Sequence, residues 1–433
     1  MFETIKNAWS IVDIRKKILF TLFILLIFRL GSILPVPFVD SAAIAAALES
    51  SSQQEFWSYL SVLSGGGLQY GALFAMSVTP YINASIILQL LTVAIPALER
   101  LSKEGEEGRK KIAQITRYAA VVLGLIQGTA YFFYLKNSNL LIDSVKGVGW
   151  EIFAGAVIIA AFTAGSALVM WLGEQIDVKG IGNGISMILF AGILSRAPDA
   201  FAAMWNTAFG ADPKPIPVIA IIVMFLLVIA FIVWMTRAER RVPIQYAKRV
   251  VGRKQYGGQN SHIPFKVNMS GVMPIIFASS ILMLPTMILS FANAEEATWK
   301  KVLMLFSYQD LLYAAIYFVL IIGFAYFYAQ IQYNPVEIAN NIRKNGGSVP
   351  GIRPGKSTSD YFAKILSRIT LLGALFLSVI AILPIIVANI GDLGAMNIAL
   401  GGTSVLIVVG VALDTVQNLE SQMMMRHYKG FLD

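Results

Sequence analysis

Cysteine is absent from this chain of 433 residues, histidine occurs twice, and charged residues make up only 14% of the sequence. Without cysteine, disulfides, thiolate metal sites and cysteine nucleophiles are excluded. The two histidines, His262 and His427, lie in polar surroundings and argue against a histidine metal cluster. We therefore expect no metal and no cofactor.

Enzyme motifs are also missing. The sequence has no H-E-x-x-H, no G-x-S-x-G and no pair of aspartates inside an apolar segment. Gly355-Lys356-Ser357 is like the end of a phosphate-binding loop, but Pro350 stands where that loop requires glycine. We expect no catalytic residues and no enzyme activity.

Apolar residues are abundant instead, at 57% of the chain, which indicates a helical membrane protein that crosses the bilayer many times. A span needs about 20 apolar residues. On this basis we predict ten spans, near residues 18–35, 74–96, 115–135, 151–173, 184–199, 215–236, 270–291, 311–331, 367–388 and 400–418.

Basic residues predict the orientation. If the N-terminus is cytoplasmic, the cytoplasmic segments carry 27 of the 34 Lys and Arg residues and the outer loops carry 6. Lys and Arg concentrate on the cytoplasmic side of membrane proteins. We therefore expect both termini in the cytoplasm. Arg29 lies inside the first span, where the sequence favours a snorkelling or helix-pairing role.

Residues 57–96 organise the chain. A short apolar turn precedes Gly65, Gly66 and Gly67, and a long apolar segment interrupted by Pro80 follows. The first piece is too short to cross a bilayer, which predicts a re-entrant helix, a glycine joint and a spanning helix. Non-helical backbone at membrane depth must be buried in protein or line a wet cavity. This stretch is thus a candidate plug and wall of a pore.

An internal repeat relates the two parts of the chain. VTPYINASIILQL at 78–90 aligns with VMPIIFASSILML at 272–284, at an offset of 194 residues. The matching spans are five apart and so cross in opposite senses, which is typical of inverted halves. We predict an N-terminal half, 1–205, and a C-terminal half, 206–433. Pro80 and Pro274 coincide. Each is expected to kink its span, which can be a matter of packing alone, but a matched pair at the repeat interface also points to a pathway between the halves.

The spans contain few ionisable groups, whereas solute transporters and pumps usually place such groups near the midplane. An aliphatic pathway can instead pass a chemically varied chain and seal against ions by dewetting. Two long cytoplasmic loops, 237–268 and 332–366, are basic, and the second has a tip stiffened by proline and glycine. The basic residues of these loops could serve only to orient the protein in the membrane and to contact anionic lipids. The length of the loops, however, favours docking of an RNA or an acidic partner.

The chain resembles the SecY family, the channel subunits of the bacterial protein-conducting translocon. The resemblance runs from about Ile14 to Tyr428. The motifs that carry it include FRLGSILPVP (28–37), SGGGL (64–68), TPYINASIILQLL (79–91), WLGEQIDVKGIGNGIS (171–186), RRVPIQYAKR (240–249), GGSVPGIRPGKST (346–358) and GGTSVLIVVGVALD (401–414).

This resemblance implies an all-α fold of ten spans in two pseudo-symmetric five-helix halves, with a plug at about 56–70 that includes Leu63, Ser64 and the three glycines. It also implies an aliphatic pore ring of Val78, Ile82, Leu189, Ile276 and Ile407. The polar lining of a lateral gate is expected at Asn83, Gln89, Gln127 and Ser280. Partner-binding loops are expected at Arg240, Arg241, Lys248, Arg249, Arg253, Lys254 and Arg353.

The implied function is a passive protein-conducting channel of the bacterial plasma membrane. It would pass unfolded secretory chains and release transmembrane segments sideways into lipid. The implied partners are SecE and SecG subunits, the SecA motor, the translating ribosome with its rRNA, signal peptides and nascent chains. The alternative is a secondary transporter of an apolar solute, which would bind solute at the midplane and would not need the long loops.

Overall fold

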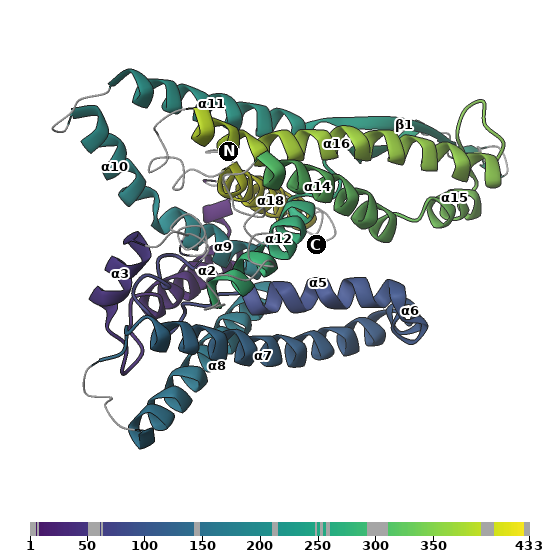
Figure 1. Cartoon of the computed structure of the whole chain (residues 1–433). Coiled ribbons are helices and arrows are strands. Elements are labelled where there is room, and N and C mark those ends of the chain that lie inside the picture. The colour runs from purple at the N-terminus through teal and green to yellow at the C-terminus, as the bar shows by residue number, and fades with distance from the viewer. Residues whose placement is uncertain are drawn as a thin grey trace. The chain divides into compact units, whose positions relative to one another are not determined.

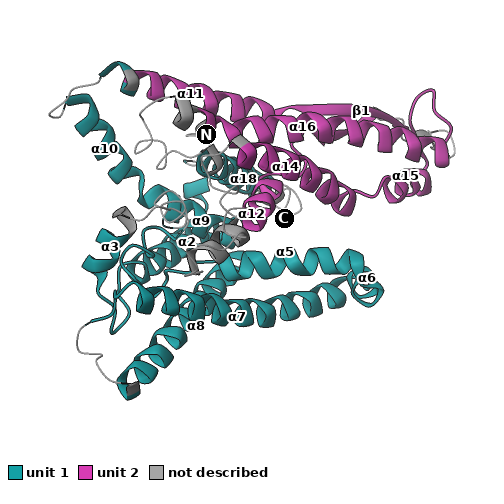
Figure 2. Ribbon diagram, viewed as in Figure 1, with its two compact units in different colours: residues 1–218, 284–304, 393–433 teal, residues 219–283, 305–392 magenta. Residues whose placement is uncertain are grey.

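A computed structural model of the chain describes residues 6, 8–50, 61, 64–142, 148–209, 215–246, 249–251, 254–256, 260–291, 311–390 and 402–427. Helices make up most of these residues (Figure 1). Three predicted site residues, Leu63, Lys248 and Arg253, lie outside the described residues. The chain forms two compact units (Figure 2).

Unit 1 comprises Met1–Val218, Leu284–Met304 and Leu393–Asp433. Its helices are α2 (Val12–Gly31), α3 (Ser41–Ser50), α5 (Thr79–Ala94), α6 (Pro96–Lys103), α7 (Glu106–Asn137), α8 (Val148–Lys179), α9 (Gly184–Ser195), α10 (Ala197–Phe209) and α18 (Gly402–His427). The C-terminal helix α18 therefore belongs to the same compact unit as the N-terminal helices.

Helix packing in unit 1 follows a simple order. Helix α5 packs beside α7, α7 beside α8, α2 against α8 and α9, and α9 against α18 (Figure 1). A core near the end of α7 includes Tyr131, Phe132, Leu135, Ile158 and Phe162, all nearly or fully buried. Close packing of such side chains holds membrane helices together through van der Waals contacts.

Unit 2 comprises Ile219–Met283 and Leu305–Asp392. Its helices are α11 (Pro215–Arg237, beginning in unit 1), α12 (Met273–Phe291, ending in unit 1), α14 (Leu311–Gln332), α15 (Pro335–Lys344) and α16 (Lys356–Ile390). Its strands are β1 (Glu239–Tyr246), β2 (Arg249–Val251), β3 (Lys254–Tyr256), β4 (Asn260–Lys266) and β5 (Gly347–Ser348).

The two predicted cytoplasmic loops meet in one small sheet of unit 2. Strand β1 pairs antiparallel with β4 and with β5, so the strand order is β4-β1-β5. Val242 and Ile244 are each 1% exposed and pack with Phe265 and Phe362 in one core. The two loops thus form one folded structure, which we call the folded base, in which the sheet packs against α15 and α16.

The sequence repeat extends to the start of two helices. Helix α5 begins at Thr79 and α12 begins at Met273, which are equivalent positions at the offset of 194 residues. The amide of Ile82 donates to the carbonyl of Val78 at 3.0 Å, and Ile276 donates to Val272 at 3.2 Å. The repeated residues therefore form the same local structure twice.

The expected proline kinks are wrong. Pro80 and Pro274 each occupy the second residue of a helix, where no amide hydrogen is needed for the helical ladder. Both prolines therefore start a helix instead of bending one. The pronounced bend lies elsewhere, at 101° between α5 and α6.

Seven described helices are long and apolar enough to cross a membrane, and eight if α5 and α6 count as one bent span. Several are longer than a bilayer requires, since α7 and α8 have 32 residues each. The polytopic helical architecture is confirmed, while the exact count of ten spans stays a prediction. The two halves, 1–205 and 206–433, also stay a prediction.

Candidate functional site

The segment between α2 and α5 is irregular in backbone and yet lies inside the protein. Ser64 to Leu68 are all buried, and residues up to Val78 form turns and bends rather than a helix. Several backbone bonds fasten this segment to the chain after α2. The amide of Val36 donates to Gly71 at 3.0 Å, and that of Leu73 donates to Leu34 at 2.9 Å. Buried irregular backbone in a membrane protein is compatible with a plug or a pore wall.

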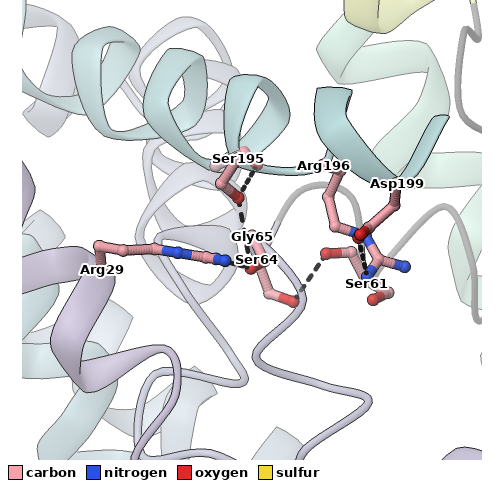
Figure 3. Close-up of polar contacts among 8 residues, drawn as sticks. Arg29, Ser61, Ser64, Gly65, Ser195, Arg196 and Asp199 are labelled. Atoms are coloured by element: carbon pink, nitrogen blue, oxygen red, sulfur yellow. Dashed lines mark hydrogen bonds and ion pairs between the residues drawn. The ribbon is translucent and has the colours of Figure 1, made fainter. Parts of the chain in front are cut away.

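Gly65 is the point where two helices hold this segment (Figure 3). Nη1 of Arg29, in the last turn of α2, donates to the Gly65 carbonyl at 2.7 Å. Oγ of Ser195, the last residue of α9, lies 3.4 Å from the same carbonyl and also donates to the Gly192 carbonyl at 2.7 Å, so its contact with Gly65 is the weaker one. From the sequence, Arg29 was expected to snorkel or to pair helices. In the structure it instead binds the backbone of the glycine segment.

The contacts of Arg29 and Ser195 with the Gly65 carbonyl were not predicted from the sequence. A charged residue inside a span is a functional candidate by default, and that signal was available for Arg29. Nothing in the sequence pointed to Ser195, because its partner is a backbone carbonyl 130 residues away. Next to it, Arg196 pairs with Asp199 at 3.1 Å (Figure 3). The guanidinium of Arg196 also lies near Gly66.

Four of the five predicted ring residues belong to unit 1. Val78 is 1% exposed, Leu189 on α9 is 5% exposed and Ile407 on α18 is 3% exposed. Ile82 follows Val78 by one helical turn, so the two lie on one face of α5. Ile276 lies on α12 in unit 2. The ring itself stays a prediction.

The predicted gate residues lie on three helices. Asn83 and Gln89 are on α5, Gln127 is on the adjacent α7, and Ser280 is on α12. The Gln89 amide donates to Ser85 Oγ at 3.5 Å on its own helix. Asn83 Oδ1 is buried and accepts no hydrogen bond from the described residues. Polar side chains of this kind join helices in a membrane.

The basic loop residues lie at the sheet of unit 2. Arg240 and Arg241 are exposed on β1, next to the buried Val242. Arg241 pairs with Glu239 at 2.6 Å. Arg249 is on β2 and Lys254 is on β3, in a two-stranded extension of the loop.

Arg353 is exposed in the turn that leads into α16. Its carbonyl accepts a hydrogen bond of 2.9 Å from Oγ1 of Thr358, in the first turn of that helix. Gly351 and Gly355 on either side adopt positive φ values of 78° and 107°. These turns agree with the expected tight tip, and they present Arg353 outward on a fixed backbone.

This arrangement is suited to passage and docking. The residues predicted to line a pathway are aliphatic, and side chains of this kind can exclude water and ions. The exposed arginines on the sheet and the tip can attract an anionic partner.

Comparison with known proteins gives consistent matches along the chain. A family model described as SecY matches residues 72–416. The chain is 42% identical over 438 residues to the protein translocase subunit SecY of Halalkalibacterium halodurans, with both chains fully covered.

Solved structures share the fold. One is a SecY structure from work on how the plug domain stabilises the closed state of the translocation channel. It matches with a TM-score of 0.66 at 17% identity, and the match covers 94% of this chain and 92% of that one. A second, Sec61 in the canine ribosome-channel complex, matches with a TM-score of 0.61 at 16% identity, with the same coverage.

Proposed function

The chain belongs to the SecY family of protein translocase subunits, and from that premise we propose which of its residues move a polypeptide across the membrane. It is a multi-pass membrane protein and a protein translocation channel. The 42% identity over the full length of a translocase subunit carries this conclusion. It argues against the alternative function, a secondary transporter of an apolar solute.

The proposed pathway is lined by Val78, Ile82, Leu189, Ile276 and Ile407, and the plug includes Leu63 to Gly67. The burial of the irregular segment after α2 supports the plug, because such backbone requires protein around it. A ring of aliphatic side chains would close around a passing chain without binding any one sequence tightly. Asn83, Gln89, Gln127 and Ser280 line the proposed lateral gate, through which apolar segments leave for the lipid.

The proposed driving force comes from partners, and this subunit itself has no catalytic role. The partners are SecE, SecG, the SecA motor, and the ribosome, whose rRNA would meet the basic residues of the sheet and Arg353. The exposed arginines on β1 and at the tip support this docking, since they are held by a folded base. The proposed location is the bacterial plasma membrane with both termini in the cytoplasm.

The pathway is tested by cross-linking, which the absence of cysteine makes simple. Single cysteines replace Ile82, Ile276 and Ile407, and control cysteines replace Val122 and Leu226, which are each 59% exposed on α7 and α11. A stalled secretory chain with a thiol cross-linker is then loaded with the partners present.

We expect adducts at the three ring positions and none at the two controls. Equal labelling of ring and control positions would show that the chain passes elsewhere. Loaded complexes without adducts at any ring position would contradict the pathway as well.

A further inference from the structure

The Gly65 carbonyl receives hydrogen bonds from two helices that are distant in sequence. Arg29 on α2 donates at 2.7 Å, and Ser195 on α9 makes a weaker contact at 3.4 Å, because its single hydroxyl proton is also donated to the Gly192 carbonyl at 2.7 Å (Figure 3). The first of these bonds is charge-assisted, which makes it about twice as strong as a neutral hydrogen bond. A backbone carbonyl held this way is fixed in position relative to both helices.

The backbone at Gly65 is shaped for this contact. Its φ of 66° lies in the left-handed region, and Gly66 follows at 88°. A Cβ on Gly65 would lie 3.2 Å from the Cα of Gly192 on α9. Glycine is therefore required here both for conformation and for the close approach to α9.

The turn around Gly65 has its own internal bonds. The amide of Gly66 donates to the Ser61 carbonyl at 2.7 Å, and Oγ of Ser64 donates to the same carbonyl at 3.1 Å. We call Ser61 and Ser64–Gly66 the plug turn. Among the residues that the structure describes, the plug turn makes hydrogen bonds to other helices only through the Gly65 carbonyl.

The backbone after the plug turn is fastened independently. Gly71 and Leu73 bond to Val36 and Leu34 of the chain that follows α2. Loss of the two bonds to Gly65 would therefore release the plug turn while the rest of the segment stayed in place. It would also leave the half-buried guanidinium of Arg29 without this acceptor, which opposes the release.

We propose that Arg29 and Ser195 are positioning residues that hold the plug turn in its closed place by binding the Gly65 carbonyl. The inference rests on the proposed function, in which this segment is the plug. Weakening either donor shifts the resting channel toward the open form, in proportion to the strength of the bond that is lost.

Ser61 supplies the reporter for the test. It is fully buried, and its hydroxyl has no hydrogen-bond partner among the described residues, so Ser61→Cys removes no such bond. The full-length chain carrying S61C is placed in nanodiscs without substrate, and the rate of labelling by a water-soluble maleimide is measured. Ion leak is measured in parallel in proteoliposomes.

We expect labelling of S61C to be slow in the parent. It should rise about tenfold with Arg29→Gln, which removes a charged hydrogen bond, and about twofold to threefold with Ser195→Ala. Ion leak should rise in the same order. The matched controls are Arg117→Gln, which breaks the ion pair with Glu174, and Thr129→Ala, which removes a hydroxyl bonded within α7; both should leave labelling unchanged.

Unchanged labelling and leak in folded R29Q and S195A would overturn the proposal. If R29Q does not accumulate, Arg29→Lys takes its place, because its ammonium lies one bond closer to the backbone and reaches the carbonyl less well. Parental labelling in both R29K and S195A would then overturn it. The cross-linking experiment described above separates the two proposals. Cross-links at the ring positions of the parent would support the channel pathway even if the role of Arg29 and Ser195 is wrong, and their absence would contradict the pathway itself.

Discussion

At the scale of single residues, the two helices of the sequence repeat begin with a shared backbone feature. Ser77, two residues before α5, has a φ of 47°, and the equivalent Gly271, two residues before α12, has a φ of 60°. Glycine adopts this conformation freely, whereas serine does so at a cost. Ser77 also buries a hydroxyl without a partner among the described residues. Unit 1 therefore carries local strain next to the predicted ring residue Val78.

Ser77→Gly should relieve this strain. We expect the substitution to raise the free energy of unfolding by about 1 kcal/mol, because it removes both the unfavourable φ and the unpaired hydroxyl. Thermal unfolding of the purified chain in detergent measures the change. The control is Ser85→Gly in the interior of α5, which should lower stability by about 1 kcal/mol. A decrease with S77G would show that Ser77 has a contact that offsets its strain.

Arg29 shows how far a single residue can be interpreted from sequence. Its position inside an apolar segment marks it as unusual, and this could be predicted. Its acceptor could not, because Gly65 is 36 residues away and offers only a backbone carbonyl. Side-chain chemistry indicates what a residue can donate, but the fold determines which acceptor is within reach.

At the scale of elements, the sheet of unit 2 turns two loops into one platform. Strand β5 comes about a hundred residues after β1, yet Gln245 lies opposite Ser348 and Tyr246 opposite Gly347. The alternation along β1 buries Val242 and Ile244 and exposes Arg241, while Arg240 is exposed near the start of the strand, on the same face as Val242. The basic residues thus depend on an apolar core for their position.

Ile244→Asp should disrupt this platform, because an unpaired charge would replace a side chain that is 1% exposed. We expect a loss of several kcal/mol in local stability, faster tryptic cleavage between residues 237 and 268, and weaker binding of ribosomes, with the chain still in the membrane. Cleavage of membrane vesicles and ribosome cosedimentation measure these effects. Gln245→Asp at the adjacent exposed position is the control. Similar results for both variants would contradict the role of the core.

At the scale of the whole molecule, net charge and hydropathy predict how the chain lies in the membrane. The formal net charge is +9, and most basic residues fall in alternate connections between predicted spans. From this asymmetry we predict that the basic loops and both termini face the cytoplasm. The same side then faces the proposed motor and ribosome.

Thiol labelling tests this orientation in whole cells. Ser138→Cys, after α7, is expected to face outward, and Lys344→Cys, at the end of α15, is expected to face the cytoplasm; both positions are exposed. A membrane-impermeant reagent should label S138C in intact cells and K344C only after permeabilisation. Each variant serves as the control for the other. Labelling in the reverse order would invert the proposed topology.

The sequence by itself determined the class of the protein, because long apolar segments cross a bilayer whatever they later pack against. It also indicated the glycine joint and the basic loops, which depend on residues close together in the chain, and the repeat, which is a match between two short stretches of sequence.

Only the tertiary structure decided the role of the repeated prolines, which start helices, and the union of two distant loops in one sheet. It likewise decided the contacts of Arg29 and Ser195 with Gly65. The physical reason is that hydropathy acts locally along the chain, whereas a hydrogen bond to a backbone carbonyl requires two distant segments to meet within about 3 Å.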